Sequence, residues 1–403
     1  MTTAPHALVT GASIAGLSTA WWLSRVGWRV TVLERADGFR EGGQNVDVRG
    51  VGREVLHRMG LYDAVLARNT TEVGTRFVDD DGGVVAELPS DDPDGATAEL
   101  EVLRGDLAGL LRDRLPETVE LVFGDSLETL TEEGDAAVVR THAGRTFRAD
   151  LVVVAEGVRS STRDQLLADA TEPTPLGITM VFGTIPRTDD DDRYWRWYTA
   201  PGGRQVHLRP DPHGTTRAML AYAHGDDEDE GLAGVDRDTM LARLRGRFTD
   251  AGWQAQRVLD GFAASDDVYA DDLERMTVTT YHRGRVVLAG DAAWCVTPLG
   301  GGGASLALTG GYVLAAFLST SPDDREAALT SYEAWMRELV DAVPSFPRAM
   351  RRVAFPQTGL GLAVRNTAAK VATSPPFSTL AGRFGHVAQS EQPLPELREA
   401  APA

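Results

Sequence analysis

The first 34 residues limit the fold more than any other part of the 403-residue chain. They read as a strand, a glycine turn, a helix, a second strand and an acid, at residues 6–10, 11–16, 17–26, 28–33 and 34. Gly11 permits the tight turn, Gly16 lets the helix pack on the sheet, and Glu34 would accept hydrogen bonds from a ribose diol. Ser13 replaces the usual middle glycine, but it is small enough for a pyrophosphate to approach. The segment therefore predicts a Rossmann-like dinucleotide-binding unit.

A second stretch also joins a buried strand to an apolar helix through glycines, at residues 286–289, 300–303 and 305–318. Asp291 follows the strand, and the loop contains four consecutive glycines. Glycine adopts positive φ without a Cβ penalty, so all the N–H groups of such a loop can turn to one side. Bare amides at a helix start favour an anionic or electron-rich partner. A flexible surface linker is the alternative, but the strand and the helix fix both ends of the loop.

The chain between these stretches predicts an inserted β-rich domain. Short antiparallel strands are expected at residues 178–185, 195–199, 205–209 and 217–223, before the chain returns to the first sheet near residue 286. The first domain is therefore discontinuous. We predict three parts: a nucleotide-binding domain (1–72, 98–172 and 277–320), a β-rich substrate domain (73–97 and 173–276) and a C-terminal helical segment (321–403).

Composition argues against several classes of protein. A net charge of −19 disfavours binding to nucleic acid or to an anionic membrane. No apolar run approaches the roughly 20 residues of a membrane span, and the N-terminus lacks the basic region of a signal peptide. Cys295 is the only cysteine, so no internal disulfide can form, which fits the cytoplasm. We predict no metal site, and we expect a monomer or a homodimer because no heptad repeat is present.

Three motifs resemble those of the class A, single-component flavoprotein monooxygenases, which include aromatic hydroxylases and tetracycline-inactivating and polyketide-tailoring enzymes. They are Gly11-Ala-Ser-Ile-Ala-Gly16 with Glu34-Arg35, then Ala149-Asp-Leu-Val-Val-Val-Ala-Glu-Gly-Val-Arg-Ser160, and Gly290-Asp291-Ala-Ala followed by Pro298-Leu-Gly-Gly-Gly-Gly-Ala-Ser305. The resemblance covers residues 8 to 318 in the family's order. It implies an α/β fold: a Rossmann-like FAD-binding domain of the glutathione-reductase type, an inserted antiparallel β-sheet substrate domain and C-terminal helices.

The same resemblance implies a reaction and a cofactor site. NADPH or NADH would reduce FAD, O2 would form a flavin C4a-hydroperoxide, and one oxygen atom would pass to an aromatic or polyketide-like small molecule or be inserted beside a carbonyl. The residues implied to contact FAD are Gly11, Ser13, Ile14, Ala15, Gly16, Glu34, Arg35, Arg40, Gln44, Arg104, Leu127, Glu156, Gly157, Asp291, Pro298, Gly301, Gly302, Gly303, Ala304 and Ser305. Glu156 and Trp294 depart from the family's usual Asp and His.

The inserted strands supply candidates for the substrate site. Arg49 and five residues of the β-rich domain are expected to face it: Phe182, Trp195, Trp197, His207 and Met219. Ordinary packing is the alternative for each. His207 and His224 could deprotonate a phenol, or could be structural histidines. No catalytic triad is apparent, so the catalytic residue is left unassigned.

Other functions are also compatible with some of these sequence motifs. A flavin-dependent reductase or dehydrogenase of the same fold is the main alternative, and a non-catalytic flavin- or ligand-binding protein is another. Covalent flavin attachment at Cys295 is disfavoured, because a buried free thiol usually packs as a small apolar group. Trp195-Arg-Trp197 weakly matches a flavin-halogenase signature, but the only lysine such chemistry could use is the distant Lys370.

Overall fold

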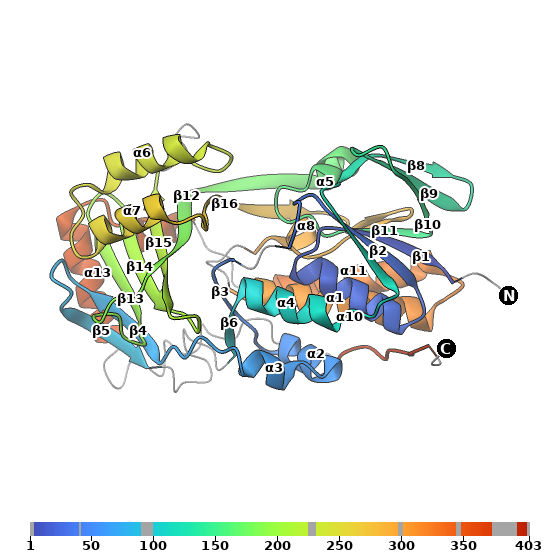
Figure 1. Ribbon diagram of the computed structural model, residues 1–403, viewed down its shortest axis with the longest axis horizontal. Helices are drawn as coiled ribbons and strands as arrows, with labels where there is room; N and C mark the ends of the chain where they lie inside the picture. The colour runs from blue at the N-terminus through green and yellow to red at the C-terminus, as the bar shows by residue number, and fades with distance from the viewer. Residues whose placement is uncertain are drawn as a thin grey trace.

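The computed structural model describes residues 4–39, 42–89, 100–224, 231–296, 301–343, 348–372 and 393–400. The chain forms two lobes, each built on one large β-sheet with helices packed against it (Figure 1). We call the lobe that contains the N-terminal strand the first lobe. The predicted α/β fold class, with an antiparallel sheet inserted between parts of a Rossmann-like sheet, is confirmed. The exact domain limits given above remain our interpretation.

The first lobe contains a six-stranded sheet in the order β17-β18-β11-β1-β2-β7. Its strands are β1 (His6–Thr10), β2 (Arg29–Glu34), β7 (Val119–Phe123), β11 (Leu151–Val154), β17 (His282–Arg283) and β18 (Val286–Leu288). All neighbours pair in parallel except β17 with β18. Every residue of β1, β11 and β18 is buried, as continuous apolar strands covered on both faces should be. The returning strand β18 therefore lies beside β11, two places from β1.

Helices and a smaller sheet cover this lobe. The helices of the first lobe and its linker segments are α1 (Ile14–Arg25), α2 (Val51–Met59), α3 (Tyr62–Leu66), α4 (Arg104–Arg114), α5 (Ser161–Leu166), the 3-10 turn η1 (Ala168–Ala170), α8 (Asp291–Trp294), α10 (Gly303–Thr320) and α11 (Arg325–Asp341). The small sheet contains β8 (Leu127–Glu133), β9 (Ala136–Thr141) and β10 (Thr146–Ala149). A two-stranded ladder, β3 (Asn45–Asp47) with β6 (Glu101–Leu103), lies between the lobes.

Helix α10 is the central helix of the first lobe. It packs so closely on α1 that a Cβ added to Gly311 would lie 2.6 Å from the backbone nitrogen of Thr19. The hydroxyl of Ser18 also donates to the carbonyl of Leu308 at 2.9 Å. By length and composition α10 could cross a membrane, which the sequence analysis did not anticipate. Because 67% of it is buried against other helices, its apolar character is explained by its place in the core.

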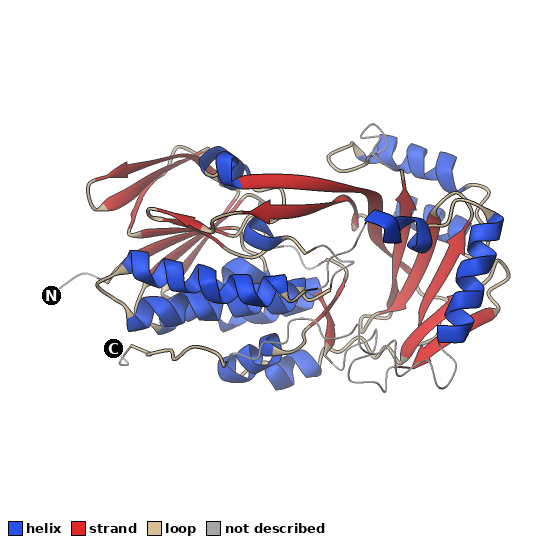
Figure 2. Ribbon diagram, turned by 180° about the vertical axis from the view of Figure 1, so that it is seen from behind, coloured by secondary structure: helices blue, strands red, loops and turns tan. Residues whose placement is uncertain are grey.

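The second lobe contains a seven-stranded sheet in the order β16-β12-β15-β14-β13-β4-β5. Its strands are β4 (Gly74–Val78), β5 (Val84–Pro89), β12 (Thr171–Pro186), β13 (Trp195–Ala200), β14 (Arg204–Pro210), β15 (Thr215–Ala223) and β16 (Val268–Val278). The long strands β12 and β16 pair with each other and run from one lobe into the other (Figures 1 and 2). They connect the lobes through a paired ladder with one register shift, between Pro175 and Thr179, and such a ladder is stiffer than a pair of loops.

Two pairs of helices pack on the second sheet: α6 (Arg237–Phe248), α7 (Ala255–Ala264), α12 (Arg348–Ala354) and α13 (Gly359–Ala372). Successive side chains of β14 point to opposite faces of the sheet. Val206 and Leu208 join the core beneath α6 and α7, and the residues between them face the other side. Phe355, directly after α12, forms part of a second apolar cluster on this sheet.

The structure also contains features beyond those predicted from the sequence. Residues 119–123 form an edge strand of the six-stranded sheet, where they pair in parallel with β2. Asp106 lies inside the first turn of α4, which has Leu103 at its N-cap position. Strand β8 and helix α7 were not anticipated. Residues 393–400 pack on the first lobe: Leu394 is buried, and the carbonyl of Pro395 accepts a hydrogen bond from the Tyr312 hydroxyl.

Candidate functional site

A single large cavity of about 2260 Å³ extends from the first lobe to the second. One end lies at the carboxyl ends of the parallel strands, where Thr10, Glu34, Phe123 and Ala155 contribute to the wall. Ligands of open α/β sheets bind at this edge. The other end lies against the face of the antiparallel sheet that is opposite α6 and α7. A ligand bound at the parallel-strand edge and a second ligand on the antiparallel sheet would therefore share one cavity.

Most of the residues predicted from the sequence line this cavity. Those at the parallel-strand end and in its loops are Gly11, Ser13, Ile14, Ala15, Glu34, Arg35, Gln44, Arg104, Glu156, Gly157, Asp291, Gly301, Gly302, Gly303 and Ala304. Those proposed for substrate are Arg49, Phe182, Trp195, Trp197, His207 and Met219, and all six line it as well.

Five predicted cofactor contacts are not among the lining residues. Gly16, Leu127 and Ser305 lie behind the wall: Leu127 is buried in β8, and the Ser305 hydroxyl accepts a hydrogen bond from the Arg49 amide at 2.8 Å. Arg40 and Pro298 lie outside the described residues.

The N-terminal glycines fit their expected roles through close backbone contacts. Gly11 has φ of +100°, and a Cβ there would lie 2.3 Å from the carbonyl oxygen of Ala155. A Cβ on Gly16 would lie 1.8 Å from the carbonyl oxygen of Gly11. Gly16 therefore supports the turn from beneath, while Gly11 brings the ends of β1 and β11 together at the cavity. Gly16 is needed for packing and does not itself reach the cavity.

Glu34 is held in place by backbone amides at the end of β2. Its Oε2 accepts a hydrogen bond from Ala12 N at 2.8 Å, and its Oε1 accepts one from Ala36 N at 2.9 Å. Each carboxylate oxygen keeps a further lone pair, so the group can still accept hydrogen bonds from a diol in the cavity. The carboxylate is thus oriented before any ligand binds.

Arg104, Ser13 and Asp291 meet midway along the cavity. The Arg104 guanidinium donates to the Ser13 hydroxyl at 2.9 Å. Asp291 is exposed to the cavity, yet protein surrounds it closely, and this desolvation raises its pKa while Arg104 partly opposes the effect. A polar ligand that donates hydrogen bonds to Asp291 and presents negative charge to Arg104 would be stabilised here.

Glu156 has a structural role that the sequence analysis did not foresee. Its carboxylate accepts hydrogen bonds from the hydroxyls of Ser160 and Thr162, both at 2.7 Å, and from Thr162 N at 3.1 Å. These contacts hold the start of α5. Trp294, the other departure from the family pattern, is 2% exposed and packs against Tyr281 and Tyr332 instead of facing the cavity.

Aromatic rings form the wall on the antiparallel sheet. Trp195 and Trp197 stack with centroids 5.3 Å apart, and Trp197 also lies 4.4 Å from the His207 ring. On strands β12 and β16 of the same sheet, Phe182 stacks on Tyr269 with ring centroids 5.3 Å apart. The wall is completed by three more apolar side chains, Met180, Met219 and Phe355. This end of the cavity therefore suits a flat, apolar ring system.

His207 is fixed as a neutral ring by a chain of hydrogen bonds. The indole N–H of Trp195 can only donate, so His207 Nδ1 accepts from it at 3.0 Å. His207 Nε2 must then carry the hydrogen and donate to Gln205 Oε1 at 3.2 Å, and Gln205 Nε2 donates to the carbonyl of Ala354 at 2.7 Å. Burial lowers the pKa of His207 well below its ordinary value, and Arg209 and Arg365 lower it further.

This arrangement gives a test that needs no ligand. We expect the His207 ring to remain the neutral Nε2–H tautomer from pH 8 down to pH 5, because both ring nitrogens are engaged and two guanidiniums oppose a third positive charge. Two-dimensional ¹⁵N–¹H NMR of histidine-labelled protein, assigned with His207→Gln, measures this directly. The half-exposed His213 serves as the internal comparison. Protonation of His207 above pH 6 would restore it as a candidate base.

His224, the other histidine considered as a base, does not line the cavity.

A buried cluster of charges joins the two lobes beside the aromatic wall. Arg209 of β14 donates to Glu72 at 2.9 Å and to Glu101 at 2.5 Å, and its guanidinium lies 4.2 Å from the Trp195 ring centroid. Both carboxylate side chains are 1% exposed. Burial raises the pKa of Glu72 to about 8, and Arg209 only partly offsets this because it faces two carboxylates. Asp47 and Arg49 extend the cluster to the cavity.

The sequence analysis missed part of the wall, although a signal was present. Residues two apart on a strand share a face. Alternation from the chosen Phe182, His207 and Met219 therefore points to Met180, Gln205, Arg209 and Arg217, all of which line the cavity. Tyr269 had no such signal, because β16 was not anticipated. Its hydroxyl hydrogen-bonds Gln44 across the cavity.

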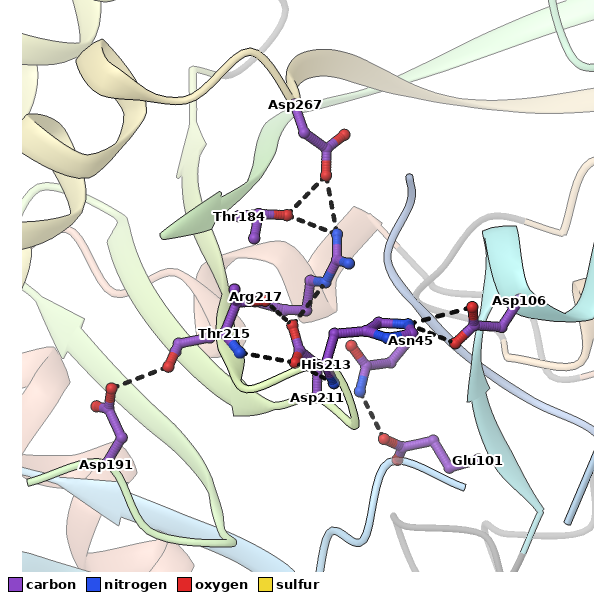
Figure 3. A network of polar contacts seen from close by, with 11 residues as sticks. Asn45, Glu101, Asp106, Thr184, Asp191, Asp211, His213, Thr215, Arg217 and Asp267 are labelled. Atoms are coloured by element: carbon purple, nitrogen blue, oxygen red, sulfur yellow. Dashed lines mark hydrogen bonds and ion pairs between the residues drawn. The ribbon is translucent and has the colours of Figure 1, made fainter. Parts of the chain in front are cut away.

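Hydrogen bonds also fix the turn between β14 and β15 against the first lobe. His213 Nε2 lies 2.9 Å from Asp106 of α4, and Arg217 links Asp211 of the turn to Asp267, directly before β16, as Figure 3 shows. Asp211 is 4% exposed and also accepts from the amides of His213 and Thr215. The edge of the cavity wall next to Asp106 is thus held from both lobes.

Comparison with known proteins identifies similar chains. A family model described as "FAD binding domain" matches residues 5–346. The FAD-dependent monooxygenase asL4 of Sarocladium schorii is 33% identical over 321 residues, which cover 76% of this chain and 74% of that protein. A flavin-dependent monooxygenase of Legionella longbeachae is 31% identical over 349 residues, which cover 84% of this chain and 87% of that protein. The solved structure of tetracycline destructase Tet(55) is similar with a TM-score of 0.78 and 27% identity, and the match covers 98% of this chain and 100% of that chain.

Proposed function

The chain belongs to the family of FAD-dependent monooxygenases that its motifs predicted, and we propose that it uses NAD(P)H and O2 to oxygenate an aromatic or polyketide-like small molecule. The observation that carries this proposal is the continuity of the cavity. It joins the parallel-strand edge, where a dinucleotide binds, to an aromatic wall on the inserted sheet. A cofactor and a flat substrate can therefore lie next to each other in this cavity. We also propose a cytoplasmic protein that is a monomer or a homodimer.

The residues of the cavity fit FAD. A Cβ added to Gly303, at the start of α10, would meet no atom of the described chain within 4 Å, and Gly301 and Gly302 both have positive φ. Backbone therefore faces the cavity here without intervening side chains. Helix-start amides of this kind stabilise an electron-rich edge such as that of a reduced flavin. At the other end, the oriented Glu34 carboxylate matches a ribose diol.

We assign the following roles within this proposal. Ser13 and Arg104 hold the pyrophosphate and the chain next to it, and Asp291 accepts hydrogen bonds from the ribityl hydroxyls. Gln44, held by Tyr269, places the loop that lies along the cofactor. When bound, FAD supplies hydride uptake from NAD(P)H and the activation of O2 for transfer of one oxygen atom. The flavin oxygen-transfer route implied by the sequence motifs is part of this proposal.

The protein's own contribution at the substrate end is positioning and exclusion of water. Trp195, Trp197 and Phe182 offer flat apolar surfaces, so a polycyclic ring would be held by stacking. His207 cannot accept a proton from the substrate, because Trp195 occupies its only free lone pair. One of the similar structures named above is that of a tetracycline destructase, which supports this class of substrate.

The proposal is tested by anaerobic stopped-flow reduction of the FAD-loaded protein by NADPH and by NADH. The reaction is run with and without a panel of phenols, quinones and polycyclic polyketides. We expect one ligand class to accelerate flavin reduction by orders of magnitude, with one nicotinamide preferred. Free FAD with the same ligands is the control for flavin reduction that does not need the protein. Negligible reduction with every ligand, from protein that holds FAD tightly, would contradict the proposal and favour the dehydrogenase or ligand-binding alternatives.

A further inference from the structure

Asp47 presents a partly satisfied carboxylate to the cavity. It lies on β3, between the lobes, and its side chain is 26% exposed. Oδ2 accepts a hydrogen bond from Arg49 at 3.1 Å. Oδ1 is buried, and no described residue donates to it. One oxygen of this group is therefore paired with a cation, while the other lacks any hydrogen.

Asn45, two residues earlier on the same face of β3, cannot supply the missing hydrogen. Its Nδ2 donates to Glu101 Oε1 at 2.7 Å, as Figure 3 shows. The reverse orientation would place the amide oxygen against that carboxylate, so the assignment of the two atoms is fixed. Asn45 Oδ1 is then directed elsewhere and also lacks a donor within the described part of the chain. This face of β3 thus carries two acceptor oxygens and no hydrogen for either.

The surroundings of Asp47 make its carboxylate easier to protonate. Glu101 of β6 lies close by, fixed by Asn45, by the Thr70 hydroxyl at 2.6 Å and by Arg209. Together with Glu72 the cluster has three carboxylates for two guanidiniums, Arg49 and Arg209. Burial, and then Glu101, raise the pKa of Asp47 to about 6, although Arg49 and Arg209 oppose the shift. The group therefore takes up a proton more readily than an exposed aspartate does.

We propose that Asp47 is the catalytic proton acceptor for a phenolic or enolic hydroxyl of the substrate, and that Arg49 pairs with the oxyanion formed. This assignment rests on the oxygenase function proposed above. The O–H bond of the substrate breaks, its electron pair stays on the substrate oxygen, and the proton adds to the Asp47 carboxylate. The net charge of the site is unchanged, because Arg49 exchanges one anionic partner for another. After oxygen transfer the proton returns to the substrate oxygen.

The proposal narrows the substrate class. An oxyanion donates electron density into its ring and so favours attack by an electron-poor oxygen atom. The substrate must therefore carry a free hydroxyl on the ring or enol that is oxygenated, and its O-methyl ether should be a poor substrate. A buried base matched to the working pH typically contributes about 10²–10⁴-fold in rate.

The test compares Asp47→Asn, which keeps the shape but cannot accept the proton, with Asp47→Glu and with the exposed Asp260→Asn as a matched control. The substrate is the phenol class found by stopped flow, supplied as a series of ring-fluorinated analogues of falling pKa. We expect Asp47→Asn to lose about 10²–10⁴-fold in kcat/KM and to lose the acid limb near pH 6. The loss should shrink as the phenol becomes more acidic, FAD affinity should stay unchanged, and Asp47→Glu should recover part of the rate. A loss that is the same for every phenol would overturn the proposal, as would retention of the acid limb in Asp47→Asn.

A second measurement needs no substrate and separates this inference from the oxygenase proposal itself. Carboxyl-labelled ¹³C NMR of the FAD-loaded resting protein, with Asp47→Asn to assign the signal, gives the pKa of Asp47. A pKa close to 6 supports the inference even if no compound of the substrate panel accelerates flavin reduction. A value at or below 4 would show a permanently ionised structural aspartate and would overturn it.

Discussion

Gly11→Ala is expected to yield protein that is purified without FAD. The added Cβ would lie 2.3 Å from the Ala155 carbonyl oxygen, and both residues belong to the cavity wall. The contact is with backbone, so it can be relieved only by separating the ends of β1 and β11. The backbone at this position must also hold φ of +100°, a conformation that residues other than glycine rarely adopt. We expect FAD affinity to fall by at least about 100-fold, that is by roughly 3 kcal/mol, the scale of such local strain.

The ratio of flavin to protein absorbance after purification measures this effect, and FAD titration of the apoprotein gives the affinity. Gly246→Ala is the matched control, because its Cβ would meet no described atom within 4 Å and the residue lies inside α6. That variant should bind FAD normally and gain about 0.5–1 kcal/mol of stability, as helical glycine-to-alanine changes do. Full FAD occupancy in Gly11→Ala would show that the turn is not the cofactor site.

Arg209→Met is expected to lower the free energy of unfolding by about 3–5 kcal/mol, because it leaves Glu72 and Glu101 buried without their shared cation. Methionine keeps much of the side-chain volume, so loss of charge dominates over loss of packing. The effect should be larger at pH 8.5 than at pH 5.5, since protonated carboxyls are less costly to bury. Thermal or urea unfolding of the FAD-loaded protein at both pH values measures the difference.

Glu72→Gln is the control for the direction in which stability changes with pH. The pKa of Glu72 is raised from its unfolded value to about 8, so its stabilising contribution is present at low pH and is lost as the pH rises through 8. The wild type should therefore lose stability between about pH 5 and pH 9 more steeply than Glu72→Gln does. Equal stability of Arg209→Met and the wild type at pH 8.5 would contradict the role given to this cluster.

The cofactor end of the cavity could be predicted from the sequence because its residues act through local patterns. Gly11, Ser13 and Glu34 lie in one βαβ unit, and the glycines before α10 lie in another short motif. In such units the spacing along the chain determines the spacing in space. The hydrogen bonds from Ser160 and Thr162 to Glu156 could not be predicted in this way, because they depend on side-chain rotamers and not on spacing.

The substrate end could be predicted only in part. Alternation on β12, β14 and β15 indicates which side chains share a face, but not that this face is the one turned toward the first lobe. The charge cluster could not be predicted, because Asp47, Glu72, Glu101 and Arg209 come from four separate segments. Their meeting depends on how β3 and β6 are placed between the lobes, which no local pattern specifies. Asp47 therefore emerged only from the structure.

The central claim, that this chain is a monooxygenase, is tested most directly by the origin of the oxygen in its product. The reaction is run under ¹⁸O2 in ordinary water with NADPH and the ligand class that accelerates flavin reduction, and the product is analysed by mass spectrometry. The account predicts one ¹⁸O atom in each product molecule. A product that contains only ¹⁶O, or consumption of NADPH that yields hydrogen peroxide and no oxygenated product across the panel, would contradict it.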